Sequence, residues 1–129
     1  MEELIERARA ALQHSYAPYS GFRVAAAVRD EQGRVFTGVN VENGSYGLTQ
    51  CAERSAICTA IGEGATAIKE VVVYTPTSEP TTPCGACRQV ISEFAKDATV
   101  MSVCDSDEQL IAESAELIPK AFVLKDVRS

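Results

Sequence analysis

The sequence lacks most of the features that mark membrane, secreted or repetitive proteins. It has no tryptophan, a single histidine, and no run of the roughly 20 apolar residues that a membrane span needs. Residues 1–4 carry neither the basic flank nor the apolar stretch of a secretion signal. Internal repeats and low-complexity tracts are also absent. We therefore expect a cytoplasmic protein that does not act at a membrane, built as one domain over residues 1–129.

Length and charge further limit the kind of protein this can be and the partners it can bind. A chain of 129 residues with 46% hydrophobic content is long enough to bury a single core. Its 12 basic and 18 acidic residues give a net charge of -6, whereas binding of nucleic acid depends on clustered lysine and arginine. The composition argues against a nucleic-acid partner and favours a small neutral or cationic substrate.

Five cysteines in a chain without an export signal argue against a disulfide framework, because cytosolic thiols stay reduced and an odd count leaves one unpaired. Clustered thiols then indicate metal binding or catalysis. Cys58 and Cys104 have no partner at ligand spacing and stand among apolar neighbours, so we expect both to be small core residues. The single histidine, His14, lies near the end of a predicted helix and is given no catalytic role.

Hydrophobic periodicity predicts an α/β fold. The predicted helices span residues 2–16, 51–62 and 84–95, with a short helical turn at 114–118. The predicted strands span residues 22–29, 34–40, 71–74 and 99–104. Residues 30–33 join the first two strands as a hairpin turn, and residues 42–50 form a loop. This order predicts a mixed sheet covered by helices.

Two short motifs place three thiols at the starts of predicted helices. Cys51 opens one helix, and Cys84 and Cys87 open another in a Cys-x-x-Cys motif. The positive end of a helix dipole favours thiolate, which is the form that binds metal. Three protein ligands are typical of a catalytic zinc, whose remaining position takes a water, whereas structural zinc takes four. The sequence therefore predicts one zinc ion with an open position.

Charged residues beside these cysteines suggest the chemistry. Glu53 follows Cys51 by two positions and is the candidate general acid and base, although a first-turn glutamate can also merely complement the helix dipole. Three thiolates on one zinc leave an anionic site, so a nearby cation is expected. Arg54 is the better candidate for this charge compensation, while Arg88 is equally well explained as a surface residue.

The Cys-x-x-Cys pair alone would fit a redox dithiol equally well. The third cysteine and Glu53 favour metal, because C-x-E followed by P-C-x-x-C is the signature of zinc deaminases. Three further blocks agree with this interpretation: YAPYSGF at residues 16–22, GVNVENGSYGLT at 38–49 and LIP at 117–119. With these motifs in this order, nearly the whole chain resembles the cytidine deaminase family in its short, three-cysteine zinc form.

The resemblance carries expectations about fold and assembly. It implies a three-layer α-β-α sandwich around a five-stranded mixed sheet, with the fifth strand near residues 121–125. It also implies a homotetramer whose active sites are completed across subunits. The substrate-binding residues it implies are Phe22, Asn40, Glu42, Tyr46, Ala52 and Phe122.

Within this set, the resemblance implies that Asn40 and Glu42 hydrogen-bond ribose hydroxyls. Phe22 would pack against the pyrimidine, Phe122 of another chain would pack on its other side, and Tyr46 would bind across the interface. Each has a plainer explanation. The two phenylalanines suit an ordinary core, and Asn40 and Glu42 suit a turn after a strand. Two polar side chains separated by one residue do, however, point to the same side of an extended segment.

The function that follows is zinc-dependent hydrolytic deamination of cytidine and 2'-deoxycytidine to uridine and 2'-deoxyuridine, with release of ammonia in pyrimidine salvage. Other substrates remain open, namely an aminoacyl-nucleoside antibiotic such as blasticidin or cytosine in a polynucleotide. The segment from Asn40 to Glu42 argues against the first, and the acidic balance argues against the second. A non-catalytic zinc-stabilised binding module is the alternative from another class, and it would need a fourth protein ligand.

Overall fold

Successive side chains of strand β3 (Ile68–Tyr74) face two separate hydrophobic cores, as the two-residue period of a strand requires. Val71 and Val73 belong to one core, and Val72 and Tyr74 belong to the other. All four side chains are buried. The sheet is therefore covered on both faces, and β3 lies at its centre.

The computed structural model describes residues 1–124, and its strands form one mixed five-stranded sheet. The strand order is β2-β1-β3-β4-β5. The β3–β4 pair is parallel, and the other three pairs are antiparallel. The remaining strands are β1 (Ala25–Asp30), β2 (Val35–Val39), β4 (Thr99–Val103) and β5 (Gln109–Glu113). The predicted mixed sheet is confirmed.

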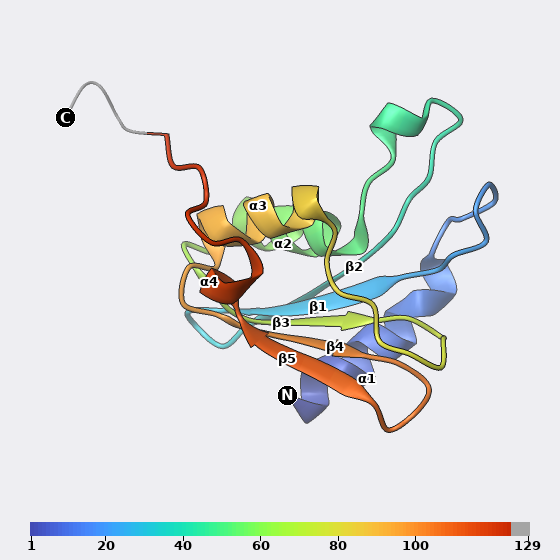
Figure 1. Ribbon diagram of the computed structural model, residues 1–129, viewed down its shortest axis with the longest axis horizontal. Helices are drawn as coiled ribbons and strands as arrows, with labels where there is room; N and C mark the ends of the chain where they lie inside the picture. Colours follow the sequence, from blue (N-terminus) through green and yellow to red (C-terminus); the bar gives the residue numbers. More distant parts are fainter. Residues whose placement is uncertain (125–129) are drawn as a thin grey trace.

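Helices cover the sheet as two outer layers (Figure 1). Helix α1 (Glu2–Ala11) packs on one face through Leu4 and Ala8. Helices α2 (Ala52–Gly62) and α3 (Gly85–Phe94) lie on the opposite face, where Ile57 and Ile91 enter the same core. Helix α4 (Ser114–Leu117) is a single turn after β5 and confirms the predicted helical turn before Pro119. This arrangement is the predicted α-β-α sandwich.

Glycine allows α2 to lie unusually close to β2. A Cβ atom built on Gly38 would lie 2.4 Å from the backbone nitrogen of Ala56 and 2.6 Å from the carbonyl oxygen of Ala52. Real Cβ atoms do not approach backbone atoms so closely, so no other residue fits here without moving the helix. The first turn of α2 is thereby held against the sheet.

The predicted hairpin turn after β1 is confirmed, and a buried carboxylate closes it. Asp30 accepts hydrogen bonds from the backbone nitrogens of Gln32 at 3.0 Å and Arg34 at 2.7 Å. The Nε of Arg34 donates to the second carboxylate oxygen of Asp30 at 2.8 Å. Gly33 adopts a φ of 84°, which suits glycine in a tight turn. The turn is fixed by one side chain bonded to both backbone and guanidinium.

Two predicted boundaries near the N-terminus are wrong. The first helix ends at Ala11 and continues as a single 3-10 turn to His14, because Tyr16 already donates its backbone nitrogen to the carbonyl of Asn40 at 3.0 Å. Strand β1 begins at Ala25 rather than at Phe22. Ahead of it, the backbone nitrogen of Val24 donates to the side chain of Asn40 instead of to a ladder partner. Side-chain hydrogen bonds therefore replace regular structure on this stretch.

The expected position of the fifth strand, residues 121–125, is wrong. That strand is β5, which precedes α4 and pairs only with β4. Residues 121–124 form no strand and run past α3, where the Nε2 of Gln89 donates to the carbonyl of Phe122 at 3.1 Å. Lys125, the last residue of the expected strand, lies outside the described residues. Because β5 is a mostly exposed edge strand with polar ends, its sequence shows little of the apolar pattern of a buried strand.

The two cysteines expected in the core, Cys58 and Cys104, differ in their exposure to solvent. Cys104 is buried at the end of β4, as predicted. Cys58 is exposed, so its prediction is wrong. Helix α2 turns Ala56, Ile57 and Ala60 toward the sheet, which leaves Cys58 on the outer surface. Within residues 1–124, no helix has the length and apolar character needed to span a membrane.

Candidate metal centre and active site

Three cysteine thiols meet where α2 and α3 begin. Cys51 is the N-cap of α2, Cys84 is the N-cap of α3, and Cys87 lies in the first turn of α3. Their sulfur atoms all lie within 4.8 Å of one another, and the Sγ atoms of Cys51 and Cys84 are 3.9 Å apart. The predicted placement of all three thiols at helix N-termini is confirmed, although each helix begins one residue later than expected.

The donor set fits zinc. Thiolates bonded at about 2.3 Å to a tetrahedral zinc lie about 3.8 Å from each other, close to the separation of Cys51 and Cys84. In the described part of the chain, the cluster of possible metal ligands at this position has three members, Cys51, Cys84 and Cys87. A zinc held by three thiolates keeps one position for a further ligand. The geometry therefore matches an open metal site.

The thiols differ in their affinity for protons. The pKa of Cys51 is lowered to about 5, first by a hydrogen bond from Cys87 and then by the guanidinium of Arg54, which together outweigh burial. The pKa of Cys87 is raised, first by its hydrogen bond to Cys51 and then by burial and the charge of Glu53. Of the two thiols, Cys51 is therefore the more acidic. Metal binding displaces thiol protons.

Arg54 is directed at the thiols. Its Nη2 lies 3.4 Å from the Sγ of Cys51 and 3.3 Å from the carbonyl oxygen of Thr49. The pKa of Arg54 is raised, chiefly by its hydrogen bond to Cys51. Its Nε is buried and has no hydrogen-bond partner among the residues that the structure describes. A positive charge therefore stands beside the sulfur cluster, as expected.

Arg88 has a different environment. Its Nε donates to the carbonyl of Pro83 at 2.8 Å, and its Nη1 donates to the carbonyl of Leu117 at 2.9 Å. Its Nη2 lies 3.3 Å from the Oγ1 of Thr82. All three contacts are with oxygen atoms, so Arg88 ties the loop before α3 to the end of α4. The guanidinium of Arg88 is thus bonded to oxygen atoms rather than directed at the thiols, and the residue is half-buried rather than fully exposed at the surface.

Glu53 is buried next to the cluster. The side chain is in the first turn of α2, and the residue is only 5% exposed. Burial raises the pKa of its carboxyl, with a smaller increase from the charge of Cys51. A raised pKa favours a carboxyl that can hold a proton as well as release it, as general acid–base chemistry requires. Glu53 combines this raised pKa with a place at the wall of a cavity.

That cavity has a volume of about 290 Å³ and extends from the thiols to the loop before β1. It brings together most of the residues predicted from the sequence, namely Phe22, Asn40, Glu42, Cys51, Ala52, Glu53 and Cys84. Sequence reasoning missed the other lining residues, which are Ser20, Val24, Thr49, Gln50, Val73, Thr81 and Thr82. The motif block at residues 16–22 was the one available signal for Ser20. The cavity thus joins the metal cluster to a polar recess.

Asn40 lies at this recess with most of its hydrogen-bonding capacity already used. Its Nδ2 donates to the carbonyl of Phe22 at 2.7 Å, and its Oδ1 accepts from the backbone nitrogen of Val24 at 3.0 Å. The hydroxyl of Ser15 also donates to Oδ1. A primary amide has two N–H donors, so among residues 1–124 one N–H of Asn40 has no protein acceptor and is available to a ligand.

Glu42 is held as a carboxylate. The backbone nitrogens of Tyr19 and Ser20 donate to its Oε1 at 2.9 and 3.1 Å, and the hydroxyl of Ser20 donates to its Oε2. The hydroxyl of Ser20 is the largest cause of a lowered pKa for Glu42. The recess therefore offers a donor from Asn40 and an acceptor from Glu42.

Besides Arg54 and Cys87, which lie at the sulfur cluster, two predicted residues do not line this cavity within one chain. Tyr46 is 78% exposed and packs edge-on against Tyr19, with ring centroids 6.3 Å apart, at a neighbouring cavity of about 360 Å³. Phe122 is 68% exposed beside α3. Both were expected to act on the site of another chain, so these positions in a single chain leave that expectation as a prediction.

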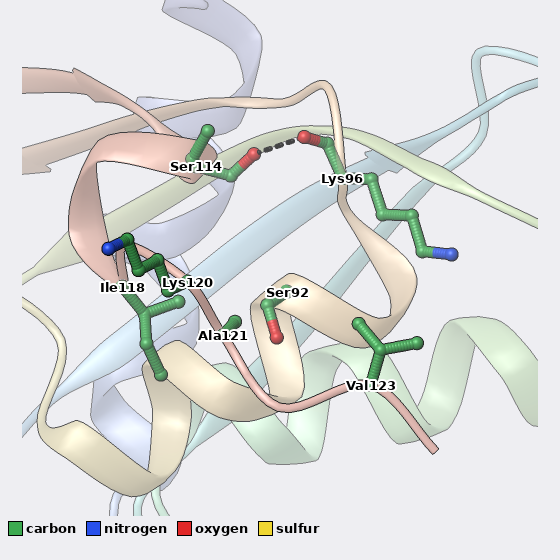
Figure 2. A pocket seen from close by; sticks show the side chains of 8 residues that line it. Ser92, Lys96, Ser114, Ile118, Lys120, Ala121 and Val123 are labelled. Atoms are coloured by element: carbon green, nitrogen blue, oxygen red, sulfur yellow. Dashed lines mark hydrogen bonds between the residues drawn. The ribbon is translucent and has the colours of Figure 1, made fainter. Parts of the chain in front are cut away.

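A further cavity of about 320 Å³ lies between α3, α4 and the C-terminal segment (Figure 2). Lys96 and Lys120 contribute to it, but their amines extend to opposite sides, so they do not converge on one ligand atom. The hydroxyl of Ser114 already donates a hydrogen bond to the carbonyl oxygen of Lys96 at 2.8 Å. This cavity lacks the thiols and the buried carboxyl of the first.

Comparisons with known proteins agree with the metal cluster. Residues 1–103 match the family model described as "Cytidine and deoxycytidylate deaminase zinc-binding region". This description identifies zinc as the metal that the three cysteines are positioned to bind.

Curated relatives and solved structures span nearly the whole chain. A cytidine deaminase of Halalkalibacterium halodurans is 43% identical, with 96% of this chain and 95% of the relative aligned. One from Sporosarcina psychrophila is 38% identical over 98% and 94% of the two chains. The crystal structure of cytidine deaminase from Burkholderia pseudomallei superposes with a TM-score of 0.89 at 42% identity, covering 94% of this chain and 98% of that one. The chain belongs to the cytidine deaminase family.

Proposed function

We propose that the protein hydrolyses the 4-amino group of cytidine and 2'-deoxycytidine, giving uridine and 2'-deoxyuridine with release of ammonia. The observation that carries this proposal is one cavity with two chemically different ends. Glu53, Cys51 and Cys84 line one end, and Asn40 and Glu42 line the other. A nucleoside has the same two parts, a base to be hydrolysed and a sugar to be recognised.

Zinc, when bound by Cys51, Cys84 and Cys87, supplies a Lewis acid that makes water reactive near neutral pH. Glu53 takes a proton from the attacking water and gives it to N3 of the ring as the water oxygen bonds to C4. Glu53 then takes the remaining proton from the new C4 hydroxyl and delivers it to the amino group, so that the C4–N bond breaks, ammonia leaves and C4 keeps a carbonyl oxygen. Its buried position and raised pKa suit a group that must carry the proton in both directions.

Arg54 offsets the charge of the thiolates in this proposal. Three thiolates on zinc leave one net negative charge, and the guanidinium stands 3.4 Å from the Sγ of Cys51. Removal of such an outer partner typically costs about 10- to 100-fold in metal affinity or activity. Arg54 therefore acts on the metal site without contacting the substrate.

Asn40 and Glu42 bind the sugar, with the free N–H of Asn40 as donor and the carboxylate of Glu42 as acceptor. Phe22 packs against the base, supported by its place in the cavity wall and its 42% exposure. Ala52 is fully buried and forms the cavity wall between Cys51 and Glu53. A free base would leave the polar groups unpaired, which favours nucleosides.

The proposal includes a homotetramer in which Tyr46 and Phe122 complete the sites of neighbouring subunits. In a single chain both aromatic side chains are mostly exposed, together with Leu48, Val123 and Leu124. These side chains form two separate groups, at residues 46–48 and 122–124, which neighbouring subunits would cover in the proposed assembly. The proposal also includes a single domain and a role in pyrimidine salvage. We place the enzyme in the cytoplasm, because zinc binding needs reduced thiols.

The test is direct. The purified protein is incubated with cytidine or 2'-deoxycytidine, and deamination is followed by ultraviolet absorbance and by ammonia release. Activity should vanish when zinc is removed by a chelator and return when zinc is restored. No turnover of either nucleoside by the zinc-loaded protein would contradict the proposal.

A further inference from the structure

The carboxylate of Glu42 accepts hydrogen bonds from a single turn of the chain. Tyr19 and Ser20 donate their backbone nitrogens to Oε1 at 2.9 and 3.1 Å. The hydroxyl of Ser20 is the donor to Oε2. Among the described residues, two backbone donors therefore hold Oε1, whereas the Ser20 hydroxyl is the one donor that holds Oε2.

The direction of the Ser20 hydroxyl is itself determined. The backbone nitrogen of Phe22 donates to the Oγ of Ser20 at 3.0 Å, so this oxygen already accepts one hydrogen bond. The single hydroxyl proton of Ser20 is therefore free to be donated to Glu42. Gly21 makes the turn possible with a φ of 70°, and its backbone nitrogen donates to the carbonyl of Ala17 at 3.0 Å. Ser20 is thus oriented by backbone contacts on both sides.

These contacts leave Glu42 with little free capacity. An ionised carboxylate has about four lone-pair sites and no donor. Three of those sites receive protein donors from Tyr19 and Ser20. The remaining site is at Oε2, beside the Ser20 hydroxyl, and both residues line the cavity that holds Phe22 and Asn40. Glu42 is therefore set up to accept one hydroxyl proton from a ligand.

We propose that Ser20 is a positioning residue for sugar recognition, which holds Oε2 of Glu42 so that its free acceptor site faces a sugar hydroxyl. This inference rests on the proposed function. Without Ser20, the bonds to Oε1 still anchor one oxygen, but the carboxylate can rotate about its terminal bond, whose torsion is broad. Oε2 of Glu42 would then be poorly oriented to accept a hydrogen bond from the sugar hydroxyl.

The experiment compares Ser20→Ala with Ser20→Thr, which keeps the hydroxyl, and with Ser106→Ala as a matched control. Ser106 is also an exposed turn serine whose Oγ accepts from the backbone nitrogen two residues later, Glu108, at 3.1 Å. Its hydroxyl donates to the carbonyl of Ser78 at 2.8 Å, outside the cavity of the proposed active site. Thermal unfolding of the zinc-loaded proteins confirms that all the variants are folded.

The readouts are kcat and KM for cytidine and the inhibition constant of 2',3'-dideoxycytidine as a competitor. This compound lacks the 2' and 3' hydroxyls of the sugar and keeps the 5' hydroxyl. Loss of one hydrogen bond to a charged group should raise KM for Ser20→Ala about tenfold. The kcat should stay within about twofold, since ground state and transition state lose the same contact. Ser20→Thr should recover most of the loss, and Ser106→Ala should match the unchanged protein. The inhibition constant of the dideoxy compound should not change.

Two results would overturn the inference while the proposed function stands. One is a KM for cytidine in Ser20→Ala equal to that of Ser106→Ala. The other is an equal weakening of cytidine and dideoxycytidine, which would show a general disturbance of the cavity. If the unchanged zinc-loaded protein does not deaminate cytidine, the proposed function itself fails, and the inference fails with it.

Discussion

Gly38 and Ala56 approach so closely that a Cβ on Gly38 would lie 2.4 Å from the backbone nitrogen of Ala56. A backbone atom cannot rotate away as a side chain can, so the strand and the helix must separate to admit a methyl group. Gly38→Ala should therefore destabilise the protein by about 1–3 kcal/mol, the usual cost of overpacking. It should also lower activity, because the first turn of α2 carries Glu53.

The measurement for Gly38→Ala is urea unfolding together with kcat/KM for cytidine. Gly62→Ala is the matched control, since Gly62 ends the same helix and an added Cβ there meets nothing within 4 Å. This control should be neutral or slightly more stable, because alanine favours helix. Equal stability of the two variants would show that the close approach does not constrain the fold.

Replacement of Glu53 by glutamine should separate zinc binding from catalysis. Glutamine keeps the size of the side chain but cannot carry a proton, so activity should fall by about 10²- to 10⁴-fold. Zinc content should remain stoichiometric, because the three sulfur atoms are unchanged. Glu63→Gln, at an exposed position just after the same helix, should retain full activity. Full activity in Glu53→Gln is the outcome that excludes its proton-transfer role.

Loss of one thiol should remove the metal. Cys84→Ala should bind no stoichiometric zinc and should unfold at a lower temperature than the zinc-loaded protein. At free zinc 1,000-fold above Kd, bound metal adds about 4 kcal/mol to the free energy of unfolding, and the variant forgoes this gain. Cys58→Ala is the control, because Cys58 is exposed and outside the cluster. Metal analysis that finds one zinc per chain in Cys84→Ala would falsify the three-thiolate site.

The Asp30 carboxylate predicts a pH dependence of stability. Burial alone would raise its pKa, but hydrogen bonds from the backbone and guanidinium of Arg34 and from Gln32 outweigh burial and lower it. A carboxyl whose pKa is lower in the folded state stabilises that state above its unfolded pKa of about 3.9. This contribution is lost as pH falls through the folded pKa.

Asp30→Asn should therefore be less stable than the unchanged protein at pH 7, and the difference should shrink as pH falls below about 4. Unfolding by urea at several pH values measures this difference directly. Asp97→Asn, at an exposed position, should show a much smaller effect at every pH. A difference for Asp30→Asn that does not vary with pH would mean that the lost contribution does not depend on the charge of the carboxylate.

The cluster of three thiols and the buried glutamate beside it were predictable, because a cysteine or glutamate at a helix start is recognisable from local sequence. A cysteine at a helix start is recognisable from the residues on either side, and Cys51, Cys84 and Cys87 all lie at such positions. The two sheet faces were predictable for the same reason, since Val71 to Tyr74 are apolar on both faces of a strand. In each case a short window of the chain contains the whole signal.

The missed features depend on contacts between distant segments. Strand β5 is defined by pairing with β4, and its exposed residues carry little apolar pattern. The role inferred for Ser20 depends on Glu42, 22 residues later, which only the folded turn brings within reach. Cys58 was misplaced because its apolar neighbours do not reveal which way the helix is turned. Local patterns do not contain this information.

If Asn40 binds the sugar as proposed, its contacts also restrict how this enzyme can change its substrate. Its amide holds the backbone of Phe22 and Val24 and accepts the hydroxyl of Ser15, so the same side chain supports the loop that forms the cavity. A mutation at Asn40 selected for a different sugar would weaken that loop at the same time. Evolution toward new sugars is therefore easier through the turn that contains Ser20, where exposed residues can change without removing a buried amide.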